Sequence, residues 1–275
     1  MPVDFFVGLG AASSIVTLAQ TRKQITSKTE MYLNYLKKGK RKIAILGAGG
    51  VGKTSISLLL SGNKDEISFE YDESINTEKL KLGNNTIGNF IIGPGQARRV
   101  ESYWPNIQRD IVQGSIVGII NVVAYGYHSI GIDLDKVSYY NTSMTNEDFI
   151  TEHTQKRRKI EIELLDYVKS SLIHSKGKIR MLTIVNKQDL WWSENTNNEV
   201  ENFYKKGNYN EMIKEIESQK GKTHFLHEYV SMSSVINNFV VKDKIIKYNT
   251  QGYDQRLQLA NNLNVTKALE GLTKN

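Results

Sequence analysis

A glycine-rich stretch near residue 50 has the residue types and spacing of a loop that holds phosphate groups. It fits the pattern Gly-(x)4-Gly-Lys-Ser/Thr in full, as Gly47-Ala48-Gly49-Gly50-Val51-Gly52-Lys53-Thr54, and Ser55 follows directly. Glycines let backbone N–H groups approach phosphate oxygens where larger side chains would clash. The Lys53 ammonium would neutralise the β- and γ-phosphates, and the Thr54 hydroxyl would be a ligand of Mg²⁺. The whole stretch from Gly47 to Ser55 therefore predicts a nucleotide site.

The neighbouring segments are those that a phosphate-binding loop requires. The apolar run 43–46 precedes it and has the character of a buried strand. The apolar run 56–60 follows it and is typical of a helix, which Gly62 would end. A helix that begins at Lys53 would direct its free N–H groups and the positive end of its dipole at the phosphates. We therefore expect a strand, loop and helix in that order.

A second polar motif follows another predicted strand. Residues 180–185 form an apolar run, and Asn186-Lys187-Gln188-Asp189 comes directly after it. Parallel sheets bind ligands at the carboxyl ends of their strands, which is where this motif would lie. The Asp189 carboxylate can accept hydrogen bonds from two adjacent donors, the N1–H and the exocyclic amino group of guanine. Adenine lacks this pair of donors, so the motif favours a guanine nucleotide.

The rest of the sequence alternates between predicted strands and helices, which indicates an α/β fold with a mostly parallel sheet. Residues 78–92 have the pattern of an antiparallel hairpin with turn residues in its middle. The other predicted elements are strands over 115–123 and 223–230 and helices over 152–173, 196–219 (in two pieces) and 254–273. We expect a helical extension over 1–40 and one domain over 41–275, with insertions near 124–150 and 235–253.

The composition excludes several classes of site. The chain has 275 residues and no Cys, which excludes disulfides, thiolate zinc sites, iron–sulfur clusters and cysteine nucleophiles. Its five His show no spacing typical of metal ligands. The longest mainly apolar run, 5–19, has 15 residues, whereas a membrane-spanning helix needs about 20. An integral membrane protein is therefore not expected, and neither is a signal peptide, because the positive charges follow the apolar run.

The positive charge is concentrated at the N-terminus. The formal net charge is +7, and residues 1–43 contribute +6 of it through eight basic and two acidic residues. A broken amphipathic pattern over 1–40 predicts an arm that contacts a membrane surface or a partner helix; the alternative is an arm that packs on the domain. The basic run has no interleaved aromatic residues, so nucleic-acid binding is not expected.

The phosphate loop and the Asn186–Asp189 motif together resemble the small GTPases of the Ras, Rab and Arf type. This resemblance implies a P-loop GTPase fold: a mostly parallel six-stranded sheet with one antiparallel edge hairpin and helices on both faces. It implies binding of GTP and GDP with Mg²⁺ and a switch between two conformations. Lys187 would pack along the guanine ring, and Asn186 would tie the base loop to the phosphate loop. Ser231-Met232-Ser233 resembles the last family motif, whose backbone N–H contacts the guanine carbonyl.

The chain departs from the family where the family places an Asp that holds Mg²⁺. The matching string is Ile92-Gly93-Pro94-Gly95-Gln96, so Ile92 stands in the place of that Asp. Ile cannot accept a hydrogen bond, so a weaker or different metal site is expected. The resemblance still implies that Gly95 gives its N–H to the γ-phosphate and that Gln96 orients the attacking water. Thr77, with Ser74 as the alternative, is the candidate for the switch residue that ligates Mg²⁺ beside Thr54.

Three functions follow from these residues. The first is a GTP/GDP switch in the cytoplasm, peripheral at a membrane through residues 1–40, that hydrolyses GTP slowly and controls a regulatory or effector protein. The second is a scaffold that binds GTP or GDP without hydrolysis, which Ile92 and Pro94 favour. The third is an ATPase that uses the same phosphate loop.

Overall fold

The computed structural model describes residues 42–61, 78–82, 85–242 and 244–273. The predicted arm over 1–40 lies outside these residues, as do the candidate switch residues Thr77 and Ser74. In the part of the chain that is described, no helix is both long and apolar enough to cross a membrane.

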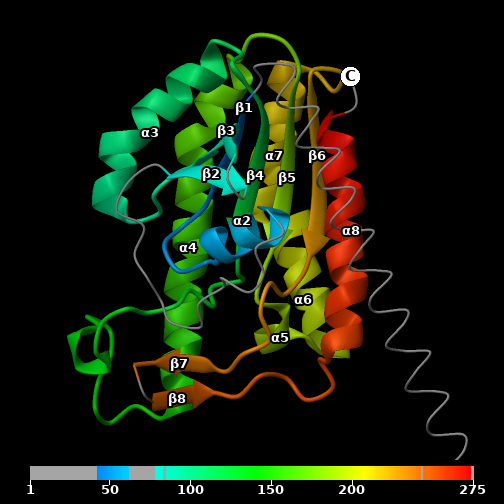
Figure 1. The fold of residues 1–275 in the computed structure, drawn as a ribbon. Coiled ribbons are helices and arrows are strands. Elements are labelled where there is room, and N and C mark those ends of the chain that lie inside the picture. The colour runs from blue at the N-terminus through cyan, green and yellow to red at the C-terminus, as the bar shows by residue number, and fades with distance from the viewer. Residues whose placement is uncertain (1–41, 62–77, 83–84, 243, 274–275) are drawn as a thin grey trace, which may run out of the picture.

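A six-stranded sheet forms the centre of the domain, in the order β2-β3-β1-β4-β5-β6 (Figure 1). Five strands run parallel, and β2 pairs antiparallel with β3 at one edge. The strands are β1 Lys42–Leu46, β2 Glu78–Leu82, β3 Asn85–Ile92, β4 Ile116–Val123, β5 Ile179–Val185 and β6 Phe225–Ser231. The predicted α/β fold with a six-stranded sheet and one antiparallel edge hairpin is confirmed.

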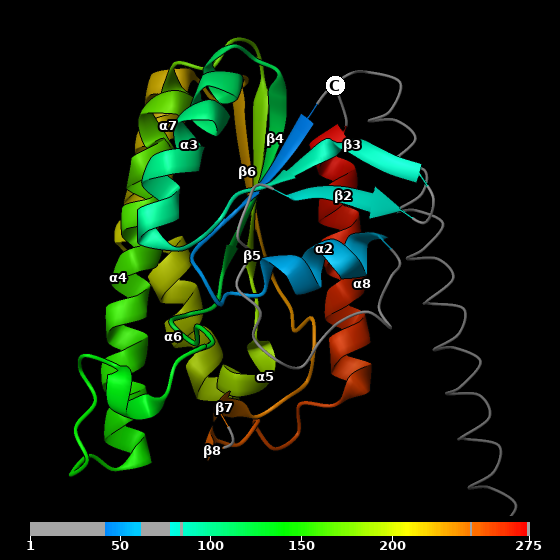
Figure 2. The same cartoon turned by 60° about the vertical axis from the view of Figure 1, so that its left-hand side comes forward.

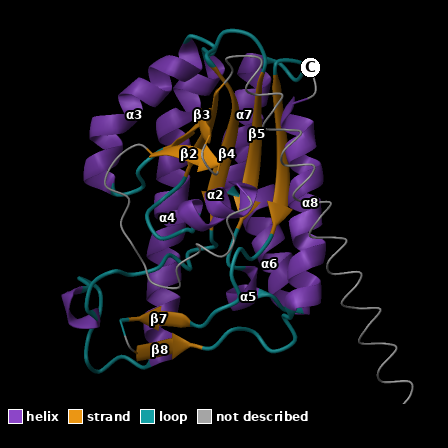
Figure 3. Ribbon diagram, viewed as in Figure 1, coloured by secondary structure: helices purple, strands orange, loops and turns teal. Residues whose placement is uncertain are grey.

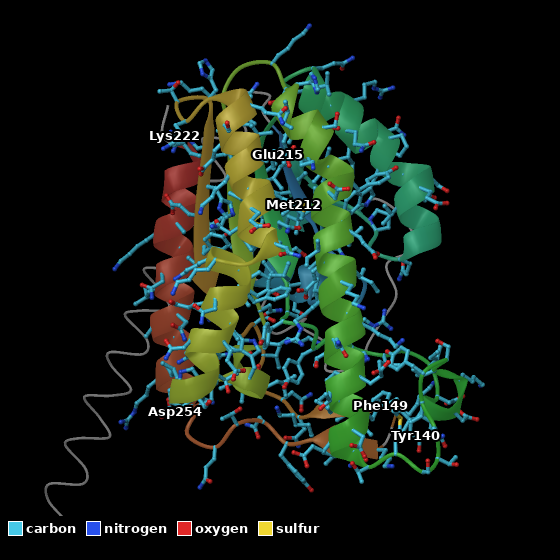
Figure 4. The ribbon with its side chains drawn as sticks, turned by 180° about the vertical axis from the view of Figure 1, so that it is seen from behind. Tyr140, Phe149, Met212, Glu215, Lys222 and Asp254 are labelled. Atoms are coloured by element: carbon cyan, nitrogen blue, oxygen red, sulfur yellow. The ribbon has the colours of Figure 1, made fainter. Side chains whose placement is uncertain are left out.

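Helices cover both faces of the sheet, as Figures 1 and 2 show. One face packs on α3, α4, α6 and α7, and the other on α2 and α8, each with its own buried apolar cluster. The bounds are α2 Lys53–Ser61, α3 Ala97–Val112, α4 Asn146–Ile173, α5 Gln188–Trp191, α6 Glu194–Lys205, α7 Asn208–Lys220 and α8 Gln255–Thr273. In Figure 4, α4 and α7 lie side by side over the sheet, with Met212 and Glu215 labelled on α7.

A small second sheet lies beyond the carboxyl ends of the central strands (Figure 3). It pairs β7, Phe239–Val241, antiparallel with β8, Lys244–Lys247. A single bridge joins Val241 to Ile130 in the loop after β4, and a short 3-10 helix, Leu134–Lys136, follows in the same loop. The two long connections, after β4 and after β6, therefore meet beside the carboxyl edge of the sheet.

The sequence prediction left out helix α3, although its signal is present. Val100, Trp104, Ile107 and Ile111 recur at intervals of four, three and four residues, and all are buried in the core. Pro105 interrupts this pattern, because proline lacks the N–H that an interior helix residue donates. Trp104 nevertheless packs inside the core, and its indole N–H donates to the Pro94 carbonyl at 2.8 Å.

Helix α4 is longer at its start than predicted, and its inner face carries a glutamate. Its first turn begins at Asn146, because Thr145 and Asp148 form a capping box. Its buried stripe runs through Glu161, Leu165, Val168 and Leu172. A glutamate at a buried position of the stripe is what the apolar pattern alone could not predict.

We predict that Trp104→Ala lowers the free energy of unfolding by about 3–5 kcal/mol. The substitution leaves a cavity between α3 and the sheet and removes the donor that Pro94 uses. Denaturant unfolding would measure the loss. Tyr248→Ala is the control, because that ring is 71% exposed, and its effect should stay within about 0.5 kcal/mol. Equal losses in the two variants would contradict the role of Trp104 in the core.

Candidate nucleotide-binding site

The phosphate loop leads from β1 into α2 and curls around the Lys53 ammonium. The Lys53 Nζ donates to the carbonyls of Gly47 at 2.9 Å and Ala48 at 2.8 Å, and the side chain is only 7% exposed. Val51 is buried and fixes the middle of the loop on the core. Thr54 is exposed and Ser55 half-buried in the first turn of α2. The loop therefore holds one cation at its centre, at the N-terminus of a helix, which is an arrangement suited to phosphate.

Asn186 ties the two predicted recognition loops together. Its side-chain amide donates to the Val51 carbonyl at 2.8 Å, and its Oδ1 accepts the Ser234 N–H at 3.0 Å. Gly52 has a positive φ of 92°, and a Cβ there would lie 2.4 Å from the Asn186 amide nitrogen. Only glycine allows this approach. The amide therefore joins the ends of β1, β5 and β6.

The Lys187 side chain extends from the base loop, residues 186–189, to the loop after β4. Its Nζ donates to the Ser129 hydroxyl at 2.7 Å, and burial lowers the pKa of this ammonium to about 8. The Ser129 N–H in turn donates to the Gly50 carbonyl at 2.9 Å. Ser129 thus contacts both the phosphate loop and the base loop, a role that no sequence motif indicated.

The Asp189 carboxylate is buried at the carboxyl edge of the sheet. It accepts the Ser233 hydroxyl on one oxygen and the Asn237 N–H, at 2.9 Å, on the other. Burial raises the pKa of this carboxyl, and its two hydrogen bonds act in the opposite direction. Ser233 is the last residue of the Ser231–Ser233 motif, of which Ser231 ends β6 and Met232 is buried. The Met232 N–H donates to the Val185 carbonyl, so this N–H is already paired with β5.

The phosphate loop, the base loop and the last motif thus meet at one edge of a six-stranded sheet. This is a P-loop GTPase-like α/β fold, with the strand order and the loop positions that the resemblance implies. In this fold, the segment after β3 lies on the phosphate loop. The Gly95 carbonyl accepts the Gly49 N–H at 2.8 Å, and a Cβ on Gly95 would lie 2.5 Å from the Lys53 Nζ. Gln96 follows directly, half-buried, as the residue that precedes α3.

The position at which the family places an Mg²⁺-binding Asp is apolar in this structure. Ile92 ends β3, is buried in the core and pairs with Ile45 of β1, so it offers no ligand. Among the described residues, no group of three or more His, Asp or Glu could hold a metal ion. The Thr54 hydroxyl fits Mg²⁺ by position and chemistry. Thr77 lies outside the described residues.

No protein-family model and no curated protein matches this chain. Among solved structures, it is similar to Toc33 from Arabidopsis thaliana, in a dimerization-deficient mutant, at 14% identity and a TM-score of 0.44, over 91% of this chain and 92% of that one. It is similar to GDP-bound Sar1, a small COPII coat GTPase from Encephalitozoon cuniculi (15%, TM-score 0.33, 83% of each chain). It is also similar to the GDP form of the signal recognition particle receptor SRb from Chaetomium thermophilum (10%, TM-score 0.36, 71% and 89%). At these identities, the assignment of each site residue depends on its own contacts.

Buried histidines hold the loop after β4 in place. His153 of α4 lies 2.9 Å from the His128 carbonyl through Nε2 and 2.6 Å from the Tyr139 hydroxyl through Nδ1. Burial, followed by the charge of Arg157, lowers the pKa of His153 to about 3. The imidazole is therefore neutral at physiological pH: its Nε2–H donates to the carbonyl and its Nδ1 accepts from Tyr139.

We predict that the folded protein loses stability as the pH falls from about 6.5 to about 3. Unfolded His153 takes up a proton near pH 6.5, whereas folded His153 does so only near its lowered pKa of about 3. The free energy of unfolding therefore falls on acidification, by up to about 1.4 kcal/mol per pH unit for this residue. His153→Gln should reduce the slope between pH 6 and 4 in denaturant titrations. His174→Gln, at an exposed position just after α4, is the matched control; an equal reduction there would contradict the assignment.

Proposed function

We propose that this protein binds GTP and GDP with Mg²⁺ and acts as a switch that controls a protein partner. The observation that carries the proposal is the hydrogen bond from Asn186 to Val51, which joins the phosphate loop to the base loop. It fixes the loop that carries Lys53, a cation suited to phosphate, against the loop that carries Asp189, a carboxylate suited to guanine.

In the proposed complex, residues Gly47 to Ser55 hold the phosphates. The Lys53 ammonium would exchange its two carbonyl partners for β- and γ-phosphate oxygens. Lys187 would pack along the guanine ring. The Ser233 N–H would contact the guanine carbonyl, since the Met232 N–H is used within the sheet. Ser231 is the last residue of β6 and would hold this motif at the end of the strand.

The Asp189 carboxylate would read the base. Guanine presents its N1–H and its exocyclic amino group side by side, and an ionised carboxylate accepts both. The Ser233 hydroxyl occupies one oxygen and the Asn237 N–H the other, so the base would share both oxygens with these donors or displace them. A carboxylate oxygen has two acceptor positions, which makes sharing feasible.

Metal binding would depend on Thr54 and Thr77, because the position of the third family ligand is Ile92. When bound, Mg²⁺ would neutralise the charge that develops between the β- and γ-phosphates. With no carboxylate at residue 92, the metal would be held by the two hydroxyls, the nucleotide and water. Weak metal binding and slow hydrolysis follow.

We predict that Asp189→Asn weakens GDP binding by at least about a hundredfold and improves binding of xanthosine diphosphate. Asn replaces one acceptor with an N–H donor, which opposes the guanine amino group but matches the C2 carbonyl of xanthine. Calorimetric titration with each nucleotide would measure the two changes in affinity. Asp135→Asn, at an exposed position, should bind GDP as the unchanged protein does. If ATP competes with GDP as well as GTP does, the guanine assignment is wrong.

The two remaining alternatives differ in hydrolysis. Gln96 precedes α3, next to Gly95 on the phosphate loop, where it could orient a water toward the γ-phosphate. A scaffold that binds GTP without hydrolysis is the second candidate, and the specific observation that favours it is the buried Ile92.

We predict slow phosphate release from GTP that falls at least about tenfold in Gln96→Leu, with GTP affinity unchanged. The reason is that leucine cannot orient water but leaves the phosphate loop intact. A single-turnover assay with GTP and Mg²⁺ would measure the rate. Gln113→Leu, exposed at the other end of α3, is the matched control. No release from the unchanged protein at any Mg²⁺ concentration would instead establish the scaffold function.

The proposed partner is a regulatory or effector protein. The segment Gly93–Gln96 touches the phosphate loop and continues into α3, so a γ-phosphate would alter a surface that a partner can contact. The proposed location is the cytoplasm, peripheral at a membrane, and is supported by the net charge of +6 over residues 1–43.

A further inference from the structure

A fully buried carboxylate on α4 organises the loop that follows β4. The Glu161 Oε1 accepts the backbone N–H of Ala124 at 2.8 Å and of Gly126 at 3.3 Å, and it lies 2.8 Å from the His128 Nε2. The Oε2 accepts the Tyr204 hydroxyl of α6 at 2.6 Å. The side chains of Glu161 and His128 are both completely inaccessible to solvent.

Every partner of this carboxylate is a donor. Burial lowers the pKa of His128, so its imidazole is neutral and its Nε2–H donates to Glu161. Burial also raises the pKa of Tyr204 well above its usual value, which keeps the hydroxyl protonated. That hydroxyl donates to Glu161 and accepts the Tyr125 N–H at 2.9 Å. An amide or an apolar side chain at residue 161 could not satisfy all these donors at once.

The loop that Glu161 holds ends on the nucleotide site. Ser129 follows His128 directly, and its N–H donates to the Gly50 carbonyl of the phosphate loop at 2.9 Å. Its hydroxyl accepts the Lys187 Nζ of the base loop at 2.7 Å. A Cβ on Gly50 would lie 2.4 Å from the Ser129 carbonyl oxygen, which shows how closely the two loops pack. A single short loop, which ends at Ser129, therefore connects the carboxylate to the phosphate loop and to the base loop.

The same helix fixes this loop at two further points. His153 lies 2.9 Å from the His128 carbonyl, as described above. Gly126 has a φ of 82°, and a Cβ there would lie 2.2 Å from the backbone carbonyl of Thr154 on α4. The loop is therefore held on α4 at these two points in addition to its bonds to Glu161.

We propose that Glu161 is a positioning residue that sets how long the nucleotide stays bound, by holding Ser129 against the phosphate loop and Lys187. This inference rests on the proposed nucleotide binding. Because Tyr204 of α6 bonds Glu161, α6 would also contribute to the control of nucleotide release.

Packing of α4 on the sheet would not need a carboxylate at this position. Burying a carboxylate costs free energy unless its hydrogen bonds are made. Leu165 and Val168 fill the next positions of the buried stripe with apolar side chains. The carboxylate differs from them because its bonds go to the loop that leads to Ser129 and to Tyr204.

The test measures the dissociation rate of a fluorescent GDP analogue from Glu161→Gln in the full chain. If the amide keeps its oxygen on the Ala124, Gly126 and His128 donors, its NH2 faces the Tyr204 hydroxyl, which loses its acceptor. Because that hydroxyl also accepts the Tyr125 N–H, the loop should loosen. We expect dissociation to be at least about tenfold faster, corresponding to the loss of one or two buried hydrogen bonds. Glu163→Gln, exposed on the same helix, should release the analogue at the unchanged rate.

Two comparisons separate positioning from stability. Val168→Ala should lower the melting temperature through a cavity in the same helix, yet leave the dissociation rate within about twofold. Combining Glu161→Gln with Ser129→Ala should accelerate release by less than the product of the single effects, because both changes act on one contact. If Glu161→Gln does not fold, Tyr204→Phe, which removes one donor to the carboxylate, takes its place.

The inference is overturned if Glu161→Gln releases the analogue no faster than Val168→Ala, or if its effect multiplies with that of Ser129→Ala. Failure of the unchanged protein to bind GDP or GTP would overturn the proposed function, and the inference with it. The first result leaves nucleotide binding intact, so the two failures are distinguishable.

Discussion

The hydrogen bond from the Asn186 amide to the Val51 carbonyl is the contact on which the candidate site depends. It joins two loops whose residues lie 135 positions apart in the sequence. Parallel pairing of β1, β4 and β5 brings the carboxyl ends of these strands to one edge. The amide then fixes the loops against each other, and the glycine at position 52 makes room for it. Ser129 bonds both loops as well, so the Lys53 ammonium and the Asp189 carboxylate are held in place relative to each other.

The same edge contains several polar groups that are buried and satisfied. Asp189, Glu161 and His153 each have protein partners, and each belongs to a segment that borders the site. Burial of such groups costs free energy unless their hydrogen bonds are made, so these networks allow few alternative arrangements. The loops at this edge are therefore set by specific bonds as well as by packing, which is what recognition of a polar ligand requires.

The departure at Ile92 has a structural consequence beyond the loss of a metal ligand. Its side chain joins the apolar cluster beneath α2 and α8, so the end of β3 is held by core packing. Two residues after Ile92, the Pro94 carbonyl accepts the indole N–H of Trp104. The segment Gly93–Gln96 is thus anchored at its start, and Gly95, which follows these anchors, accepts the Gly49 N–H of the phosphate loop. In the proposed switch, any movement of this segment would be confined to a short, tethered stretch.

The sequence by itself determined the phosphate loop, the base motif, the edge hairpin and the alternation of strands and helices. These signals are local. Glycine spacing, a lysine at a helix start and apolar runs of strand length can be recognised without knowing which residues they contact in the fold. Helix α3 was missed because Pro105 obscured a periodicity that Trp104 and its neighbours carry. Only the tertiary structure decided the roles of Glu161, Ser129 and Asn237. A glutamate within a charged helix looks like a solvated residue, and its burial depends on a loop 35 to 37 residues earlier in the chain. Which donors meet a carboxylate is a property of the packed sheet and its connections, so no local pattern encodes it.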